Sequence, residues 1–196
     1  MITPPRLAPF EVHDSDERSV ALAEVAALLF DCLGPLHELR DADHELLCRS
    51  AIGVEFIHAM GNYSTLEHEL FGLALDELTA LEAFIVEAAA CLAADAVAVD
   101  PCSMWARLSD HDARRVLWFA AMLRLAEGLV GERRSRVGGV YATWTHETLY
   151  VEVDGSVLGG EDLARSRGAA LEAVSGRRLL LTSSRERREA LRVPAA

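Results

Sequence analysis

The segment Leu46–Leu73, LLCRSAIGVEFIHAMGNYSTLEHELFGL, has the pattern of two helices separated by a turn. Asp41 or Asp43 is suited to cap the first helix, because a carboxylate accepts hydrogen bonds from the free N–H groups of a first turn. Gly61 is typical of the residue that follows a helix. Ser64-Thr-Leu-Glu67 has the spacing of a capping box, which predicts the start of the second helix. We therefore expect a pair of helices joined by a short turn.

The chain on either side of this pair is also helical in pattern. Residues 1–14 are rich in proline and irregular, which predicts an arm. Val20–Leu33 is apolar on most faces of a helix, and we expect Gly34–Pro35 to end it, because proline cannot continue the hydrogen-bonded turns. Thr79-Ala-Leu-Glu82 is a second capping box and predicts a helix that runs to about Ala96.

A further helix should begin at Ser109-Asp-His-Asp112 and run to about Val130. Its apolar side chains lie on almost every side, and a helix of that kind is buried at the centre of a fold.

After Gly131 the hydrophobic period changes from that of a helix to that of a strand. Val137–Thr145 and Thr148–Val153 predict an antiparallel hairpin that turns near His146. The remaining elements are a helix over 161–174 closed by Gly176, a third strand over Leu179–Thr182, and a charged helix or tail over 184–192. The sequence therefore predicts an α+β fold, mainly α, in which a helical block precedes a small ββαβ unit.

Composition narrows the functional classes. The chain has 196 residues and a net charge of −12, and residues 1–110 hold 5 of the 19 arginines but 20 of the 31 acidic residues. Such a field repels polyanions, which disfavours nucleic acid and leaves only the C-terminal part for a polyanion contact. No apolar run reaches the length of a membrane span, no signal peptide is evident, and the four cysteines lack CxxC spacing. These features favour a cytoplasmic protein with reduced thiols.

Three sequence signatures in a fixed order suggest a family. They are the frame LLCRSAIGVEF…HELFGL, the helix VLWFAAMLRLAEGLV at Val116–Val130, and the tail TLYVEVDG…ALEAVSGRRLLL. Together they resemble the C-terminal, HD-like region of the exopolyphosphatase / guanosine pentaphosphate phosphohydrolase family, over about residues 18–183. The resemblance implies an arm at 1–18, an HD-like helical domain at 19–132 and a small ββαβ subdomain with a charged tail at 133–196.

The resemblance also implies that the chain lacks the family's catalytic part. In that family the phosphohydrolase site belongs to actin-like domains with Gly-rich phosphate loops, and no P-loop or GxGxxG motif occurs here. The metal-binding His-Asp pair of true HD enzymes corresponds to Val54 and Glu55, and Val54 has no ligand atom. The resemblance therefore predicts no catalytic residue, no metal and no cofactor, and a vestigial pocket consisting of Val54, Glu55, His58, Asn62, His68 and Glu127.

Partners for these polar residues can be anticipated from the cost of burying charge. We expect Glu55 to pair with an arginine such as Arg124, and Glu127 to pair with an arginine from 133–136. His58 and His68 are expected to be neutral and hydrogen-bonded. The remaining histidines are expected near helix ends or turns, at the surface: His13, His37, His44, His111 and His146.

Three functions remain open. The first is a non-catalytic, exopolyphosphatase-related module that acts by binding, dimerisation or regulation; the resemblance implies a homodimer and allows a protein partner that supplies an enzymatic half. The second is a residual HD-type phosphohydrolase that uses a divalent metal with Glu55, His68 and Glu127. The third is a polyphosphate-binding module, for which the candidate residues are Arg133, Arg134, Arg136, Arg177 and Arg178.

Overall fold

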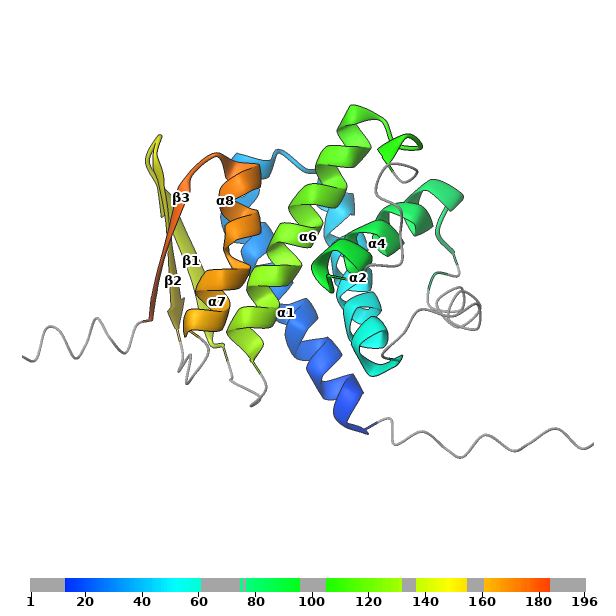
Figure 1. Cartoon of the computed structure of the whole chain (residues 1–196), viewed down its shortest axis with the longest axis horizontal. Helices are drawn as coiled ribbons and strands as arrows, with labels where there is room; N and C mark the ends of the chain where they lie inside the picture. Colours follow the sequence, from blue (N-terminus) through cyan, green and yellow to red (C-terminus); the bar gives the residue numbers. More distant parts are fainter. Residues whose placement is uncertain are drawn as a thin grey trace, which may run out of the picture.

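The structure, a computed structural model, describes residues 13–60, 75, 77–95, 105–131, 137–154 and 161–183. The described helices are α1 (His13–His37), α2 (Asp41–Met60), α4 (Ala80–Ala93), α6 (Asp110–Val130), α7 (Glu161–Arg167) and α8 (Ala169–Ser175), and the strands are β1 (Gly139–Trp144), β2 (Thr148–Asp154) and β3 (Arg178–Ser183). The predicted α+β class, mainly α, is confirmed. In Figure 1 the sheet lies at one end, α7 and α8 lie beside it, α6 lies at the centre, and α2 and α4 lie on the far side.

Helix α6 is the central element, as its all-round apolar pattern predicts. It packs against α1, α2, α4, α7 and α8. Ser109 caps its first turn by accepting a hydrogen bond from the Asp112 N–H at 3.2 Å. Where α6 meets α7 the backbones are so close that a Cβ on Gly128 would lie 2.5 Å from the Cα of Ala164. Glycine at this position therefore permits the contact.

The capping box predicted at Thr79 is present, whereas neither aspartate predicted to cap α2 lies at the cap position. Thr79 and Glu82 form the capping box of α4, with the Thr79 N–H donating to Glu82 Oε2 at 2.9 Å. Asp41 and Asp43 lie in the first turn of α2 itself, and Asp43 accepts a hydrogen bond from the N–H of Arg40, the residue before the helix, at 2.9 Å. The same carboxylate is buried and accepts a hydrogen bond from Arg115 Nε at 2.9 Å, which ties α2 to α6.

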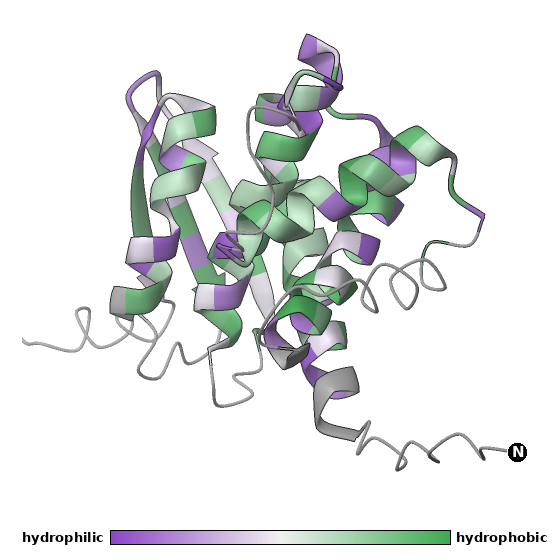
Figure 2. Cartoon of the chain, turned by 45° about the vertical axis from the view of Figure 1, so that its right-hand side comes forward, coloured by the Kyte–Doolittle hydropathy of each residue, from purple (hydrophilic) through white to green (hydrophobic). Residues whose placement is uncertain are grey.

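The three strands form one sheet in the order β1-β2-β3. β1 and β2 form the expected antiparallel hairpin, and β3 lies parallel to β2, with Tyr150 opposite Leu180. A parallel neighbour requires a crossover connection, and α7 and α8 supply it. The inward side chains of β2, Leu149, Val151 and Val153, are buried and belong to the same core cluster as Phe119 of α6. Figure 2 shows hydrophobic residues along the inner helices and strands and many hydrophilic ones at helix ends.

Two boundaries differ from expectation. Pro35 does not end the first helix, because α1 continues to His37. The residue before a proline is normally kept out of the helical region partly by its Cβ, and Gly34 has none. The single helix expected over 161–174 is divided into α7 and α8 at Gly168, where a Cβ would lie 2.4 Å from Leu179 Cδ2. Glycine has a low helix propensity, and here it leaves room for the leucine of β3.

The N-terminal helix also changes two other expectations. α1 begins at His13, inside the segment 1–18 assigned to an arm. An 18-residue window within Glu17–His37 has a mean hydropathy of 1.7, so this helix is long and apolar enough to cross a membrane by length and composition alone, contrary to the expectation that no apolar run reaches that length. The charged residues Glu24 and Asp31 interrupt this apolar stretch, so it does not stand out as a continuous hydrophobic run in the sequence. Core helices pass the same test, and α1 contributes the fully buried Leu29 and Leu33 to the core.

Candidate functional site

The candidate pocket is formed by α2 and α6. Glu55 and His58 are three positions apart on α2, a spacing that places both side chains on one face of a helix. Glu127 lies in the last turn of α6, and its Oε1 is 2.6 Å from His58 Nε2. Val54 is fully buried among the core residues and offers no polar atom. Glu55, His58 and Glu127 are thus the polar members that the structure brings together, while Asn62 and His68 lie outside the described residues.

Glu55 is buried and faces an arginine from the first helix. Its side chain is 7% exposed, and its Oε1 lies 3.3 Å from Arg18 Nε. Burial raises the pKa of Glu55, an effect that the positive charges of Arg18 and His58 oppose and the negative charge of Glu127 reinforces. The partner expected from sequence, Arg124, is wrong, because Arg124 Nη2 lies 2.6 Å from Asp95 Oδ1.

Glu127 is equally buried, with 6% of its side chain exposed, and has two cationic neighbours. His58 contacts one oxygen, and Arg167 Nη1 from α7 lies 3.6 Å from the other. Arg167 also binds Asp95 Oδ2 at 2.9 Å and the carbonyl oxygen of Ala93 at 3.4 Å, at the end of α4. The residues 133–136, expected to supply the partner of Glu127, lie outside the described part of the chain.

We call this set the acid–arginine network; it comprises Arg18, Glu55, His58, Asp95, Arg124, Glu127 and Arg167. It connects α1, α2, α6 and α7 with the end of α4. The expected hydrogen bond of His58 is present, but the histidine is more basic than the neutral residue anticipated. The hydrogen bond to Glu127 raises its pKa, although burial opposes this.

The donor atoms described here do not fit a divalent metal. Among the described residues no group of three or more His, Cys, Asp or Glu side chains is placed to hold a metal ion. Glu127 Oε1 is occupied by the His58 contact, and guanidinium groups lie against both carboxylates. One oxygen of each acid, Glu55 Oε1 and Glu127 Oε2, is buried and has no hydrogen-bond partner among the described residues, so within that part of the chain each relies on its arginine at ion-pair distance.

No protein-family model matches this chain, and no curated protein matches it. The resemblance to exopolyphosphatases therefore remains an expectation from sequence.

The surroundings of the described cysteines do not favour a nucleophilic role for their thiols. Cys32, Cys48 and Cys91 form no disulfide with one another in the described part of the chain. Burial raises the pKa of Cys32 to about 12 and also raises that of Cys48. A thiol is nucleophilic as the thiolate, and both groups are held in the protonated form.

The expectation of a surface position is wrong for His37. It is 2% exposed, accepts a hydrogen bond from the Leu39 N–H through Nδ1 at 2.9 Å, and donates from Nε2 to the carbonyl oxygen of Phe30 at 2.9 Å. This pair of bonds requires the neutral imidazole with its proton on Nε2. Burial lowers the pKa of His37.

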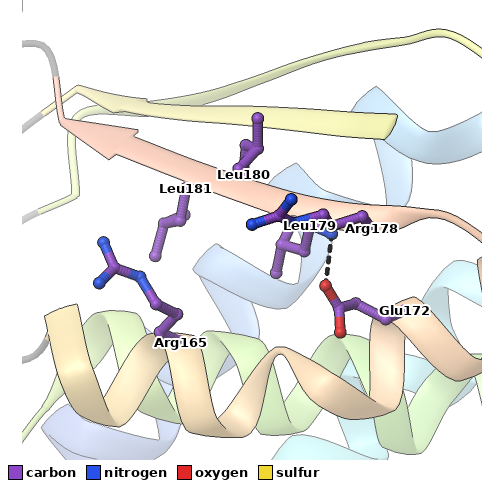
Figure 3. A pocket seen from close by; sticks show the side chains of 6 residues that line it. All are labelled: Arg165, Glu172, Arg178, Leu179, Leu180 and Leu181. Carbon is purple, nitrogen blue, oxygen red and sulfur yellow. Dashed lines mark hydrogen bonds between the residues drawn. The ribbon is translucent and has the colours of Figure 1, made fainter. Parts of the chain in front are cut away.

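Two of the five arginines proposed for polyphosphate binding, Arg177 and Arg178, are described, and their surroundings differ. Arg177 donates to the carbonyl oxygens of Thr145 at 2.9 Å and Ser175 at 2.8 Å, which ties the hairpin turn to the end of α8. Arg178 is exposed and lines a groove beside β3 together with Arg165 of α7 (Figure 3). Arg165 is absent from the set inferred from sequence, because its distance from Arg178 along the chain conceals their proximity.

Proposed function

We propose that this protein is a non-catalytic module, related to exopolyphosphatases, that acts by binding or regulation. One observation carries the proposal: both carboxylates of the pocket are met by arginine side chains, Glu55 by Arg18 and Glu127 by Arg167. The guanidinium groups supply positive charge beside the two acids, at the pocket where the resemblance would put a metal.

Physical chemistry favours this reading over a metal-dependent hydrolase. A catalytic divalent metal needs at least about three converging ligands and an open position for water or substrate. Here an incoming cation would meet the like charges of Arg18 and Arg167, and it would compete with His58 for Glu127. The network supports the helices instead, since its contacts join α1, α2, α6 and α7.

The test is metal content and turnover of the full chain purified without chelator or affinity tag. We expect no stoichiometric Mn, Fe or Zn and no hydrolysis of polyphosphate or guanosine pentaphosphate. About one metal ion per chain, with turnover that disappears in Glu55→Ala, would overturn the proposal.

A residual phosphohydrolase is the second candidate, and the two orphan oxygens favour it. Glu55 Oε1 and Glu127 Oε2 are buried and form no hydrogen bond with any residue that the structure describes, and buried oxygens of this kind are places where a water or an ion is expected. The double variant Arg18→Met/Arg167→Met separates the two candidates. If arginine charge blocks a cation, Mn²⁺ should bind this variant and not the parent chain; binding to the parent alone would support the hydrolase.

The proposal extends to the assembly and the compartment. The resemblance implies a homodimer, and the cysteine pattern together with the lack of an evident signal peptide in the sequence favours the cytoplasm. Sedimentation velocity at concentrations of tens of micromolar tests the dimer, and a strict monomer there would refute it.

A further inference from the structure

A groove runs along the edge of the sheet at which no described strand pairs with β3, between β3 and the crossover helices. Its volume is about 390 Å³, and it is lined by Arg165, Glu172, Arg178, Leu179, Leu180 and Leu181. In Figure 3 Arg165 rises from α7 toward β3, and the side chain of Leu181 points down toward the helices. An edge strand, a helix and two arginines thus border one opening.

The backbone of β3 presents hydrogen-bonding groups to this opening. The Arg178 N–H bonds to the Glu147 carbonyl, so Arg178 and its alternate neighbours point their backbone groups at β2. Because these groups alternate along a strand, those of Leu179 and Leu181 point to the open edge. The Leu179 N–H donates to Glu172 Oε1 at 2.6 Å. The outward N–H and C=O of Leu181 come next along the strand.

The charges at the opening are positive. Arg165 and Arg178 are both exposed, and no described residue forms an ion pair with either of them. The chain as a whole has a net charge of −12, so this arginine pair is a local exception. Glu172 contributes a negative charge, but its carboxylate is engaged by the strand backbone. The groove is complementary to a negatively charged ligand with apolar parts.

We propose that this groove binds an extended acidic peptide segment of a partner protein, which adds a strand beside β3. The main chain of the peptide pairs with Leu181, its acidic side chains meet Arg165 and Arg178, and its apolar side chains cover the part of Leu181 that is left exposed. Extended peptides commonly bind at exposed sheet edges in this way. The inference rests on the proposed function, since a module without chemistry of its own acts through what it binds.

Two other occupants fit the groove less well. A second copy that paired through its own β3 would bring the arginine pairs of both protomers together, and like charges at an interface are repulsive. A polyphosphate chain would match the arginines but would leave the exposed part of Leu181 and its outward backbone groups without partners. The peptide is the ligand that uses all three features of the groove.

The test uses a fluorescein-labelled peptide of about eight residues, alternating valine and glutamate, with fluorescence anisotropy on the full chain. We expect saturable binding that weakens about tenfold in Arg165→Glu and again in Arg178→Glu, the usual effect of losing one charge-assisted hydrogen bond. Arg114→Glu is the matched control, because Arg114 lies in α6 outside the groove and is 53% exposed. Equal weakening in the control would overturn the assignment to the groove.

Methylation of the peptide backbone tests strand addition directly. N-methyl groups on the residues that face β3 should abolish binding, and those on the alternate residues should leave it unchanged. Loss at every position or at none would overturn strand pairing. Displacement of the peptide by long polyphosphate, with the same arginine dependence and no methylation pattern, would assign the groove to polyanions.

The two proposals can fail separately. Absence of peptide binding by a metal-free, inactive chain would refute the groove and leave the non-catalytic module standing. Stoichiometric metal with turnover, together with alternating methylation effects, would refute the non-catalytic module and leave the groove.

Discussion

Single arginines decide the electrostatic character of the pocket. A buried carboxylate without compensation costs several kcal/mol, and Arg18 and Arg167 meet that need for Glu55 and Glu127. The choice of arginine suits the task, because its charge persists at all relevant pH values. The pocket is therefore a site where positive charge is supplied permanently by the chain.

The Arg18–Glu55 pair predicts an asymmetric mutational response. Arg18→Met should destabilise the fold by about 1–2 kcal/mol, less than a fully buried pair, because Arg18 is 40% exposed and solvent screens it. Glu55→Gln should change stability by less than about 1 kcal/mol, because it removes the desolvated charge itself. Urea unfolding at neutral pH measures both. The double variant is the control, and if it is as unstable as Arg18→Met alone, the pairing is refuted.

The His58–Glu127 contact predicts a pH dependence. The folded-state pKa of His58 is raised above 6.5, so the stabilising contact is fully present below that pH and is lost as the pH rises through the folded pKa. The nearby charges of Arg18 and Glu55 modulate the value. Relative to the parent, His58→Gln should lose about 1 kcal/mol near pH 6 and much less near pH 9, as its partial exposure limits the effect. Urea titrations at both pH values test this, and a pH-independent difference would contradict it.

At the level of helices and strands, features that depend on neighbouring residues could be predicted from the sequence, and contacts between distant residues could not. The caps at Thr79 and Ser109 could be predicted because each hydrogen bond joins residues three positions apart. The common face of Glu55 and His58 follows from helical spacing in the same way. Their partners Arg18 and Arg167 could not be predicted, since they lie on helices whose packing depends on the whole fold. The predicted helix end at Pro35 was wrong because Gly34, which has no Cβ, removes part of the steric clash between a proline ring and the residue before it.

The junction between α6 and α7 predicts a contrast between two glycines. Gly128→Ala should destabilise the fold by about 2 kcal/mol, because its Cβ would meet the backbone of Ala164 at 2.5 Å. This loss exceeds the gain of about 1 kcal/mol that alanine normally brings to a helix. Gly168→Ala is the matched control, with a smaller expected cost, because the nearest atom is the end of the Leu179 side chain, which can rotate away. Thermal unfolding of both variants measures the two changes in stability, and equal losses of stability would contradict the expected contrast.

At the scale of the whole molecule, the helices and the sheet share one core. Buried residues of β2 such as Val151 belong to the same cluster as Leu29 of α1 and Phe119 of α6. The fold class and the β1–β2 hairpin could be predicted from the change of hydrophobic period after Gly131, whereas the parallel place of β3 beside β2 was not part of that prediction. The continuity of the core could not, because it depends on how the crossover helices meet α6.

A shared core predicts cooperative unfolding. Val151→Ala in the sheet should lower the stability of the helices as well, by about 1–3 kcal/mol for the loss of a buried side chain. Far-ultraviolet circular dichroism, which follows mainly the helices, and near-ultraviolet dichroism, which follows tertiary packing, should report one common transition. Separate transitions for the two signals would show that the sheet unfolds alone.

The burial of His37 has a consequence for spectroscopy. Its imidazole packs edge-on against the indole of Trp118, with ring centroids 5.8 Å apart. A protonated imidazole quenches a neighbouring indole, and burial lowers the pKa of His37, so the emission of Trp118 should fall only below the pH range in which exposed histidines titrate. Comparison with Trp118→Phe isolates this signal from Trp105 and Trp144. The fluorescence of Trp118 should therefore report the protonation of the buried His37 side chain.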